Sequence, residues 1–255
     1  MKKTVTFAVA SLCTASVFAN SWSFFGGLGF ADFENEVNYS FAEGDAGSFS
    51  VESTNLRYEL GGSYASGKHS LTIKASALAE DDGADTEVFG VTGSEGVQDK
   101  NEVAITYGFN VGAGFTLSTG YYAGESEFQL PFPAVAGLEF KTTSDYSGYF
   151  LGGAYAARFT DWLYGYAQVG YLITQVEVTE EDIYDGVGEA AYNNDTDGDG
   201  TKFGLGFIFA VSTKDSLVLS YEAKSIEYED SETDVFDFDY KETENSLTLQ
   251  YKRTF

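Results

Sequence analysis

The chain has 255 residues, 40 acidic and 14 basic, so its formal net charge of −26 excludes nucleic acid as an expected partner. Its mean hydropathy is −0.17, and after the N-terminal segment no stretch is apolar over the length of a membrane-spanning helix. The one cysteine, Cys13, excludes an intrachain disulfide and a site built from several thiolates.

The N-terminal segment has the pattern of an export signal. It starts with the basic run Met1-Lys2-Lys3, continues with small and apolar residues over 4–18, and offers a cleavage position after Ala19. Leu12 before Cys13 does not fit a lipoprotein signal, so the cysteine is expected to leave with the signal peptide. We therefore expect a signal peptide at 1–19 and a single mature domain at 20–255.

Ten segments of the mature chain alternate between apolar and polar residues, the pattern of strands with one oily and one wet face. The clearest is marked by Phe203, Leu205, Phe207 and Phe209. The segments are 22–30, 56–64, 71–79, 103–109, 115–121, 146–156, 162–178, 203–211, 217–223 and 245–255. The sixth is outlined by Tyr146, Phe150, Ala154 and Ala156, whereas the seventh is apolar at both parities and leaves its facing open.

Short and long connections alternate along these segments. The short ones are turns at 66–69, 110–114, 158–161 and 212–215. The long ones are expected to be acidic loops at 34–50, 80–99, 124–145, 177–200 and 227–244, and they hold most of the acidic residues. Val235, Phe236, Phe238 and Tyr240 also allow a longer last hairpin, with a bulge that changes parity before Leu247.

The last segment ends on an aromatic residue. Leu247, Leu249, Tyr251 and Phe255 share one face, and Arg253 stands among them. This ending resembles the terminal strand of Gram-negative outer-membrane β-barrel proteins, in which the position of Arg253 is usually apolar. Over its mature length, the chain resembles the small OmpA/OmpX-type barrels of the porin-like superfamily in pattern. The resemblance implies that the barrel-assembly machinery reads Leu247, Leu249, Tyr251 and Phe255 as an assembly signal, and that the protein resides in the bacterial outer membrane.

The expected fold is all-β: a transmembrane antiparallel up-and-down β-barrel of about ten strands, with eight or twelve as alternatives. Barrels of this kind have an even strand number, short periplasmic turns and longer extracellular loops, which matches the alternation of the connections. A soluble β-sandwich or lipocalin-like barrel would bury its inside and would not require long connections at one end only. The strands supply the ~9–11 residues that a crossing needs.

Strand parity predicts which charged residues face the lumen. If Leu56, Tyr58 and Leu60 face lipid, then Arg57 and Glu59 face inward. The same argument on the other strands completes a balanced set of predicted lumen ion pairs: Arg57, Glu59, Lys74, Glu102, Glu222 and Lys224. Long side chains of both signs in a narrow barrel are expected to pair, with Gln168 and Gln250 as polar partners. The sequence therefore favours a closed lumen.

One acidic stretch resembles half of a calcium-binding loop. Asp195, Asp197 and Asp199 stand at positions 1, 3 and 5, and Gly200 at position 6, of an EF-hand pattern, but Gly206 occupies the place of its final Glu. The residues available to complete a calcium site are Glu180, Glu181, Asp182, Asp185 and Glu189. A flexible acidic loop tip is the alternative; no cofactor is required by the sequence, and Ca²⁺ is a possible ligand.

No catalytic constellation is expected. The one histidine, His69, is followed by Ser70 in a short turn without an evident third partner, so the resemblance to the ten-stranded omptin proteases is one of architecture. The expected function is a structural or surface-interaction barrel, and a narrow porin-like channel for small solutes or cations is the alternative. The expected partners are outer-membrane lipid, lipopolysaccharide, the barrel-assembly machinery and an unknown extracellular ligand.

Overall fold

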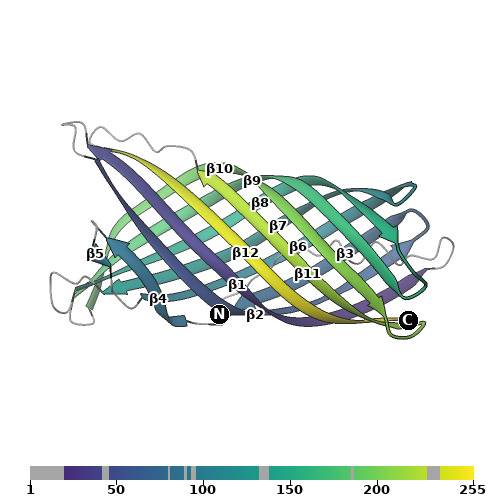
Figure 1. Ribbon diagram of the computed structural model, residues 1–255. Coiled ribbons are helices and arrows are strands. Elements are labelled where there is room, and N and C mark those ends of the chain that lie inside the picture. The colour runs from purple at the N-terminus through teal and green to yellow at the C-terminus, as the bar shows by residue number, and fades with distance from the viewer. Residues whose placement is uncertain are drawn as a thin grey trace.

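The computed structural model describes residues 20–41, 46–79, 81–88, 91–92, 96–131, 138–184, 187–228 and 236–255 (Figure 1). Within these ranges every element is a strand, and no helix is long and apolar enough to cross a membrane. The strands are β1 (Ser21–Phe41), β2 (Ala46–Ser66), β3 (His69–Leu78), β4 (Asp81–Val88), β5 (Val91–Thr92), β6 (Gly96–Gly112), β7 (Phe115–Pro131), β8 (Leu138–Arg158), β9 (Leu163–Tyr184), β10 (Val187–Ala210), β11 (Asp215–Tyr228) and β12 (Phe236–Thr254). The predicted signal peptide at 1–19, with Cys13, lies outside the described residues.

The sheet closes on itself, because β1 pairs in antiparallel fashion with both β2 and β12. Figure 1 shows this seam where the purple β1 runs beside the yellow β12. β3 and β4 are successive parts of one wall strand, since both pair with β2 on one side and with β6 on the other. β5 adds a short hairpin to β4. The wall therefore has ten strands, and the predicted up-and-down barrel is confirmed.

The outer surface carries an apolar band and the inner surface is largely polar. On β1 the exposed residues of the band are Trp22, Phe24, Leu28 and Phe30, and the next outward position is Asp32. This is about the length that a tilted strand needs to cross the hydrocarbon core. An apolar exterior around a polar interior is the arrangement of a transmembrane barrel and the reverse of a soluble one.

Aromatic residues ring the ends of this band. At the end with the short turns, the rings of Trp22 and Tyr64 lie 4.6 Å apart, as centroids. At the other end the rings of Tyr121 and Tyr149 lie 5.2 Å apart. Aromatic girdles of this kind mark the two interfaces between lipid and water. The predicted short turns are confirmed, and one of them turns at Gly67, whose φ of 58° favours glycine.

The predicted acidic loops are much shorter than expected, because the strands run on beyond the apolar band. β9 continues to Tyr184 and β10 begins again at Val187, so most of the predicted loop 177–200 is a paired hairpin. The same holds for 34–50, 124–145 and 227–244. Beyond the lipid-facing band, the strands still satisfy their backbone groups by hydrogen bonds to one another. The acidic side chains on their outer face are hydrated there. Acidity indicates hydration of a face, not the end of a strand.

Two predictions of facing are wrong. On β8 the residues Tyr146, Phe150 and Ala154 face the lumen, and Tyr149 and Leu151 face outward. On β12 no bulge separates Tyr240 from Leu247, since the register with both neighbours runs without a shift. Apolarity alone misleads on β8, because large rings also fill the lumen.

The open facing of the seventh segment is resolved. On β9 the side chains of Leu172, Thr174 and Val176 are buried in the lumen, and those of Val169 and Tyr171 are exposed outside. The lumen therefore has an apolar side, which explains why β9 is apolar at both parities.

Candidate functional site

The lumen is the candidate site, and all six charged residues that were predicted to face it do so. Arg57 and Glu59 come from β2, Lys74 from β3 and Glu102 from β6. Glu222 and Lys224 come from β11, and each of the six is at most 8% exposed. Their strands alternate so that every second residue faces inward. A buried charge is tolerated only when it is paired, so the partners decide what the lumen can do.

The first part of the network joins β3, β2 and β12. Lys74 Nζ lies 2.5 Å from Glu59 Oε1, and Arg57 Nε lies 3.1 Å from the same carboxylate. Arg57 also forms an ion pair with Glu244 and donates a hydrogen bond of 3.2 Å to Ser76 Oγ. Gln250 donates to the other oxygen of Glu59. Arg57 is thus held from three sides.

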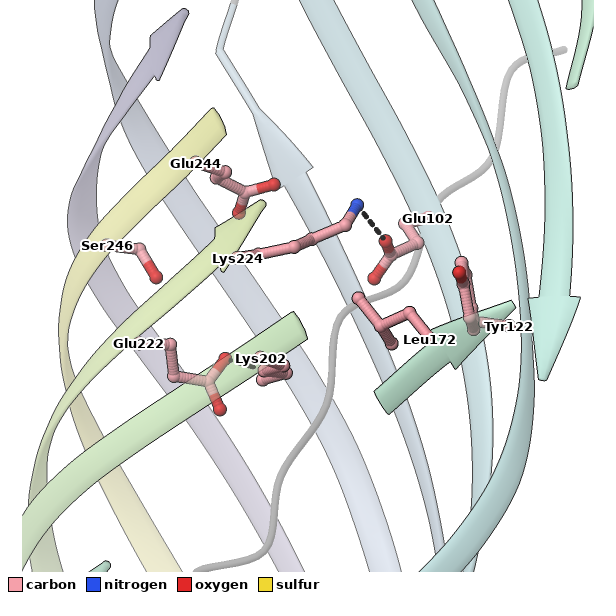
Figure 2. A pocket seen from close by; sticks show the side chains of 8 residues that line it. All are labelled: Glu102, Tyr122, Leu172, Lys202, Glu222, Lys224, Glu244 and Ser246. Atoms are coloured by element: carbon pink, nitrogen blue, oxygen red, sulfur yellow. Dashed lines mark hydrogen bonds and ion pairs between the residues drawn. The ribbon is translucent and has the colours of Figure 1, made fainter. Parts of the chain in front are cut away.

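The second part crosses the lumen. Lys100 Nζ lies 2.5 Å from Glu242 Oε1 and 3.0 Å from Glu244 Oε2. Lys224 Nζ lies 2.9 Å from Glu242 and 3.6 Å from Glu102, and Figure 2 shows this last contact spanning the space between the two strands. Cations and anions therefore alternate from Lys74 to Glu102 without a break: Lys74, Glu59, Arg57, Glu244, Lys100, Glu242, Lys224 and Glu102.

A separate pair lies on neighbouring strands. Lys202 Nζ on β10 lies 2.8 Å from Glu222 Oε2 on β11, and Gln168 Nε2 donates 2.9 Å to the other oxygen of Glu222. Of the six predicted residues, Glu222 therefore lies outside the connected series of ion pairs from Lys74 to Glu102.

Four charged members of the network were not predicted from the sequence. Glu242 and Glu244 fall in a stretch expected to be a loop, where parity has no meaning, and Lys100 lies at the edge of another. Lys202 directly precedes the predicted start of its strand at Phe203. Counting every second residue backward from Ser246 on β12 would have identified Glu244 and Glu242 as facing the lumen. The same count from Glu102 on β6 would have identified Lys100.

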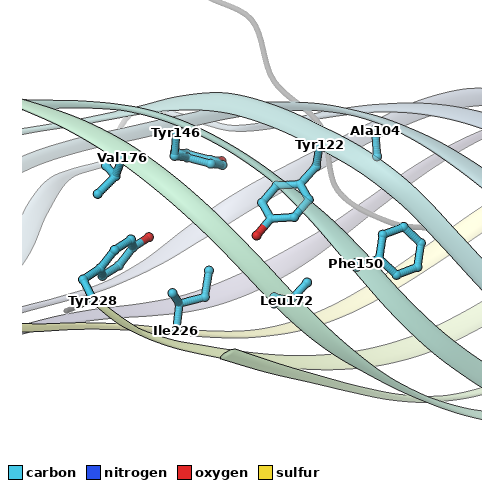
Figure 3. Packing of buried hydrophobic residues seen from close by; sticks show 8 residues of the cluster. All are labelled: Ala104, Tyr122, Tyr146, Phe150, Leu172, Val176, Ile226 and Tyr228. Carbon is cyan, nitrogen blue, oxygen red and sulfur yellow. The ribbon is translucent and has the colours of Figure 1, made fainter. Parts of the chain in front are cut away.

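An aromatic and apolar cluster occupies the lumen beside the charges (Figure 3). It consists of Ala104, Tyr122, Tyr146, Phe150, Leu172, Val176, Ile226 and Tyr228. The ammonium groups of Lys100 and Lys224 lie 5.4 Å and 5.3 Å from the ring centre of Tyr146. Such cation–π contacts stabilise ammonium groups that are removed from water. The cluster and the network together fill the middle of the barrel.

A small cavity lies between the charged network and the apolar cluster. The cavity in Figure 2 lies between the Lys224–Glu102 and Lys202–Glu222 pairs and has a volume of about 10 Å³. That is roughly the space that one water molecule needs. Tyr122 and Leu172 close it from the apolar side. This cavity is itself too small for a hydrated ion.

The electrostatics outside the lipid-facing band favour ionised carboxylates. Glu242 lies beyond that band, which begins on β12 at Leu247. Burial disfavours its charge, but Lys100 and Lys224 outweigh burial and hold the pKa of Glu242 below its ordinary value. Burial raises the pKa of the nearby Tyr228 and Tyr240, which stay neutral.

The residues of the expected assembly signal share the lipid-facing surface. Leu247, Leu249, Tyr251 and Phe255 are each about half exposed or more on the outside of β12. The ring centre of Phe255 lies 6.0 Å from that of Phe24 on β1. The four residues therefore form an apolar row at the closing seam, which Arg253 interrupts between Tyr251 and Phe255.

The expected calcium loop is a strand, and that prediction of geometry is wrong. Asp195, Asp197 and Asp199 lie on β10 and face outward at alternate positions. Carboxylates on one strand face are spaced ~6.6 Å apart or more at each step, too far to converge on one ion. Among the described residues, no group of three or more potential ligands is placed to hold a metal ion. Calcium binding itself stays a prediction.

His69 lies at the end with the short turns. Its Nδ1 shares a hydrogen bond of 2.6 Å with the Tyr107 hydroxyl, and its ring packs 5.3 Å from that of Phe109. His69 is exposed outside, whereas Ser70 is buried inside, so the two side chains lie on opposite faces of the wall. They do not form a nucleophile and base pair.

Comparisons with known proteins agree with the architecture. No protein-family model matches the sequence, and no curated protein matches it. The structure is similar to the outer membrane protease OmpT from Escherichia coli, with a TM-score of 0.59 and 10% identity over 92% of this chain and 97% of that one. It also matches OprG from Pseudomonas aeruginosa, with a TM-score of 0.40 and 9% identity over 93% and 97% of the chains. At such identities the likeness shows the fold alone, that of an outer-membrane β-barrel.

Proposed function

We propose that this protein is an integral outer-membrane β-barrel with a closed, ion-paired lumen, and that it acts as a structural or surface-interaction protein rather than an enzyme. The observation that supports this most directly is the alternating network from Lys74 to Glu102, which crosses the lumen beside a cavity of only about 10 Å³. A cation channel would more readily be lined by one sign of charge.

The apolar band and its aromatic girdles support insertion into the membrane. The signal expected at 1–19 would export the chain, and the apolar row ending at Phe255 would be read by the barrel-assembly machinery. In barrels of this class the short turns face the periplasm. The acidic hairpins would then face the outside of the cell.

The length of the wall supports a role at the cell surface. β10 has 24 residues, so it is roughly 80 Å long at ~3.3 Å per residue and, tilted by about 40°, roughly 60 Å tall. The hydrocarbon core is only ~30 Å thick. A rigid acidic collar would therefore extend among the sugars of lipopolysaccharide, where an extracellular ligand as yet unidentified is the expected partner.

The strand register places acidic residues opposite one another on this collar, which supports the binding of counterions there. Glu125 lies opposite Asp145, Asp145 opposite Glu177, and Glu177 opposite Asp195 on four neighbouring strands. Like charges in directly opposite positions repel one another. Divalent cations would relieve this repulsion and would bridge the collar to the phosphates of lipopolysaccharide. Calorimetric titration with calcium tests this binding of divalent cations, and an absence of heat would contradict it.

Conductance across a planar bilayer tests the closed lumen. The unmodified protein is expected to give no steady single-channel current. Arg57→Ala should leave Glu59 and Glu244 with one cation fewer and should open a leak or lower stability. Steady currents from the unmodified protein would instead move the channel function to first place.

A narrow porin-like channel for small solutes or cations is the second candidate. One observation favours it: Glu102 Oε1, which lines the central cavity, has no hydrogen-bond partner among the described residues. The Lys224–Glu102 contact is also the longest in the network, at 3.6 Å. If these two side chains separated, a carboxylate would be available to a small cation.

A further inference from the structure

Arg253 is a charged residue on the lipid-facing side of the barrel that the lumen network does not use. It lies on β12 between Tyr251 and Phe255, opposite Phe24 on β1 and opposite Asp215 on β11. Its side chain is 51% exposed. This is the end with the short turns, at the aromatic girdle, where an arginine on the lipid face costs only ~0–1 kcal/mol.

The carboxylate beside Arg253 is already engaged by closer donors. Asp215 accepts hydrogen bonds from the Tyr251 hydroxyl and, at 2.7 Å, from Ser212 Oγ. Arg253 Nη1 is 3.6 Å from Asp215 Oδ1, beyond hydrogen-bonding distance. The guanidinium also lies 5.8 Å from the ring centre of Phe255, and it carries five N–H donors in a planar fork, more than these neighbours use.

A second cation lies next to it. Lys214 is exposed in the turn between β10 and β11, and its carbonyl oxygen accepts a 2.8 Å hydrogen bond from the Thr254 amide. This bond fixes the turn beside the end of β12. Arg253 and Lys214 thus place two cations beside one side-chain carboxylate, and a phosphate could be held by both.

We propose that Arg253 and Lys214 bind the phosphate of an anionic phospholipid in the periplasmic leaflet. The guanidinium fork matches two phosphate oxygens, and the ammonium adds a point charge. A lipid fits better than free phosphate, because the same face continues into the apolar surface of Leu249 and Phe24, along which acyl chains would lie. The inference rests on the proposed membrane insertion and is independent of whether the lumen conducts.

A second exposed arginine at this end provides the control. Arg158 forms an ion pair with Asp161 in its own turn and donates a 3.1 Å hydrogen bond to the Thr160 carbonyl oxygen. Two of its nitrogen atoms are therefore engaged within its own turn. Arg158→Gln removes the same charge from the same end of the barrel without touching the proposed site.

Quenching of Trp22 fluorescence by brominated lipids tests the proposal. Trp22 lies beside the site, since its carbonyl oxygen accepts from the Phe255 amide at 2.8 Å, and Trp162→Phe makes it the sole tryptophan. In phosphatidylcholine vesicles, brominated phosphatidylglycerol should compete for the surface near Trp22 about fivefold better than brominated phosphatidylcholine. Arg253→Gln with Lys214→Gln should abolish the preference, Arg253→Lys should keep part of it, and Arg158→Gln should keep all of it.

Two outcomes would overturn the proposal: no preference in the parent protein, or a preference that survives the double substitution. A heat-dependent shift on gel electrophoresis, measured on every sample, establishes that the barrel has folded and inserted. Failure of the parent protein to insert would count against the proposed function instead, so the two failures are distinguishable.

Discussion

Lys100 Nζ on β6 lies 3.0 Å from Glu244 Oε2 on β12, although β3, β2 and β1 separate these strands along the wall. The contact therefore runs through the lumen. The Lys224–Glu102 pair likewise crosses the lumen and joins β11 to β6. Two ion pairs therefore connect opposite sides of the wall. Ion pairs across the lumen therefore stabilise the barrel in addition to the hydrogen bonds between neighbouring strands.

Lys100→Met should destabilise the barrel strongly. The substitution leaves Glu242 and Glu244 buried with one cation fewer, and breaking a buried pair costs about 3–5 kcal/mol. The urea midpoint of unfolding in lipid vesicles measures the change. Lys241→Met is the matched control, because its pair with Glu227 is exposed and such pairs contribute about 1 kcal/mol or less. Equal shifts for the two variants would contradict the stabilising role of the ion pairs across the lumen.

Stability should fall in acid, and Glu242 should account for part of the loss. Since its pKa is lowered in the folded state, its contribution is complete above the ordinary glutamate pKa. The contribution is lost as the pH falls through the lowered folded-state value. Glu242→Gln should therefore flatten the acid side of a plot of urea midpoint against pH. The exposed Glu227→Gln should leave the slope unchanged, and parallel slopes for all three proteins would exclude this role for Glu242.

Gly148→Ala should impair packing of the lumen. A Cβ at this position on β8 would lie 2.8 Å from Tyr122 Cζ and closer still to the Ile173 carbonyl oxygen, so both the ring and the wall would have to move. Overpacking of this kind costs roughly 1–3 kcal/mol. Gly153→Ala on the same strand is the control, because its Cβ would meet only the Thr116 carbonyl oxygen at 3.7 Å. Comparable unfolding midpoints for the two variants would show that the wall and the Tyr122 ring both adapt freely.

Deletion of Phe255 should block assembly while costing little packing. The residue is 62% exposed and its ring touches that of Phe24 only at an edge, so its loss removes few contacts. The expected result is little heat-modifiable barrel in isolated outer membranes and accumulation in the periplasm. Phe255→Tyr keeps an aromatic end and should assemble. Normal membrane levels of the deletion variant would remove Phe255 from the assembly signal.

Alternation was enough to predict the barrel, because lipid on one side and a polar lumen on the other impose opposite chemistry on neighbouring residues. It worked best on β2, where Tyr58 and Leu60 face outward around Glu59. It failed on β8, where Tyr146 and Phe150 fill the lumen. The missing signal was glycine: Gly120 leaves space for the ring of Phe150, and spacing alone does not reveal that pairing across strands.

The charged site was predictable only in part for a similar reason. Parity identified Arg57, but its partner Glu244 stands in a stretch whose acidity resembles a loop. Which cation meets which anion depends on the stagger of the strands around the barrel. Only the closed register, such as Lys224 opposite Glu244 between β11 and β12, supplies that.

The sequence separation of the ion pairs has a consequence for biogenesis. Arg57 and Glu244 are 187 residues apart, and Lys100 and Glu242 are 142 apart. Until β12 joins β1, the cations on β2 and β6 lack these carboxylates, and a partial sheet in the membrane would carry uncompensated positive charge. Formation of the last seam and neutralisation of the interior thus coincide in a single event.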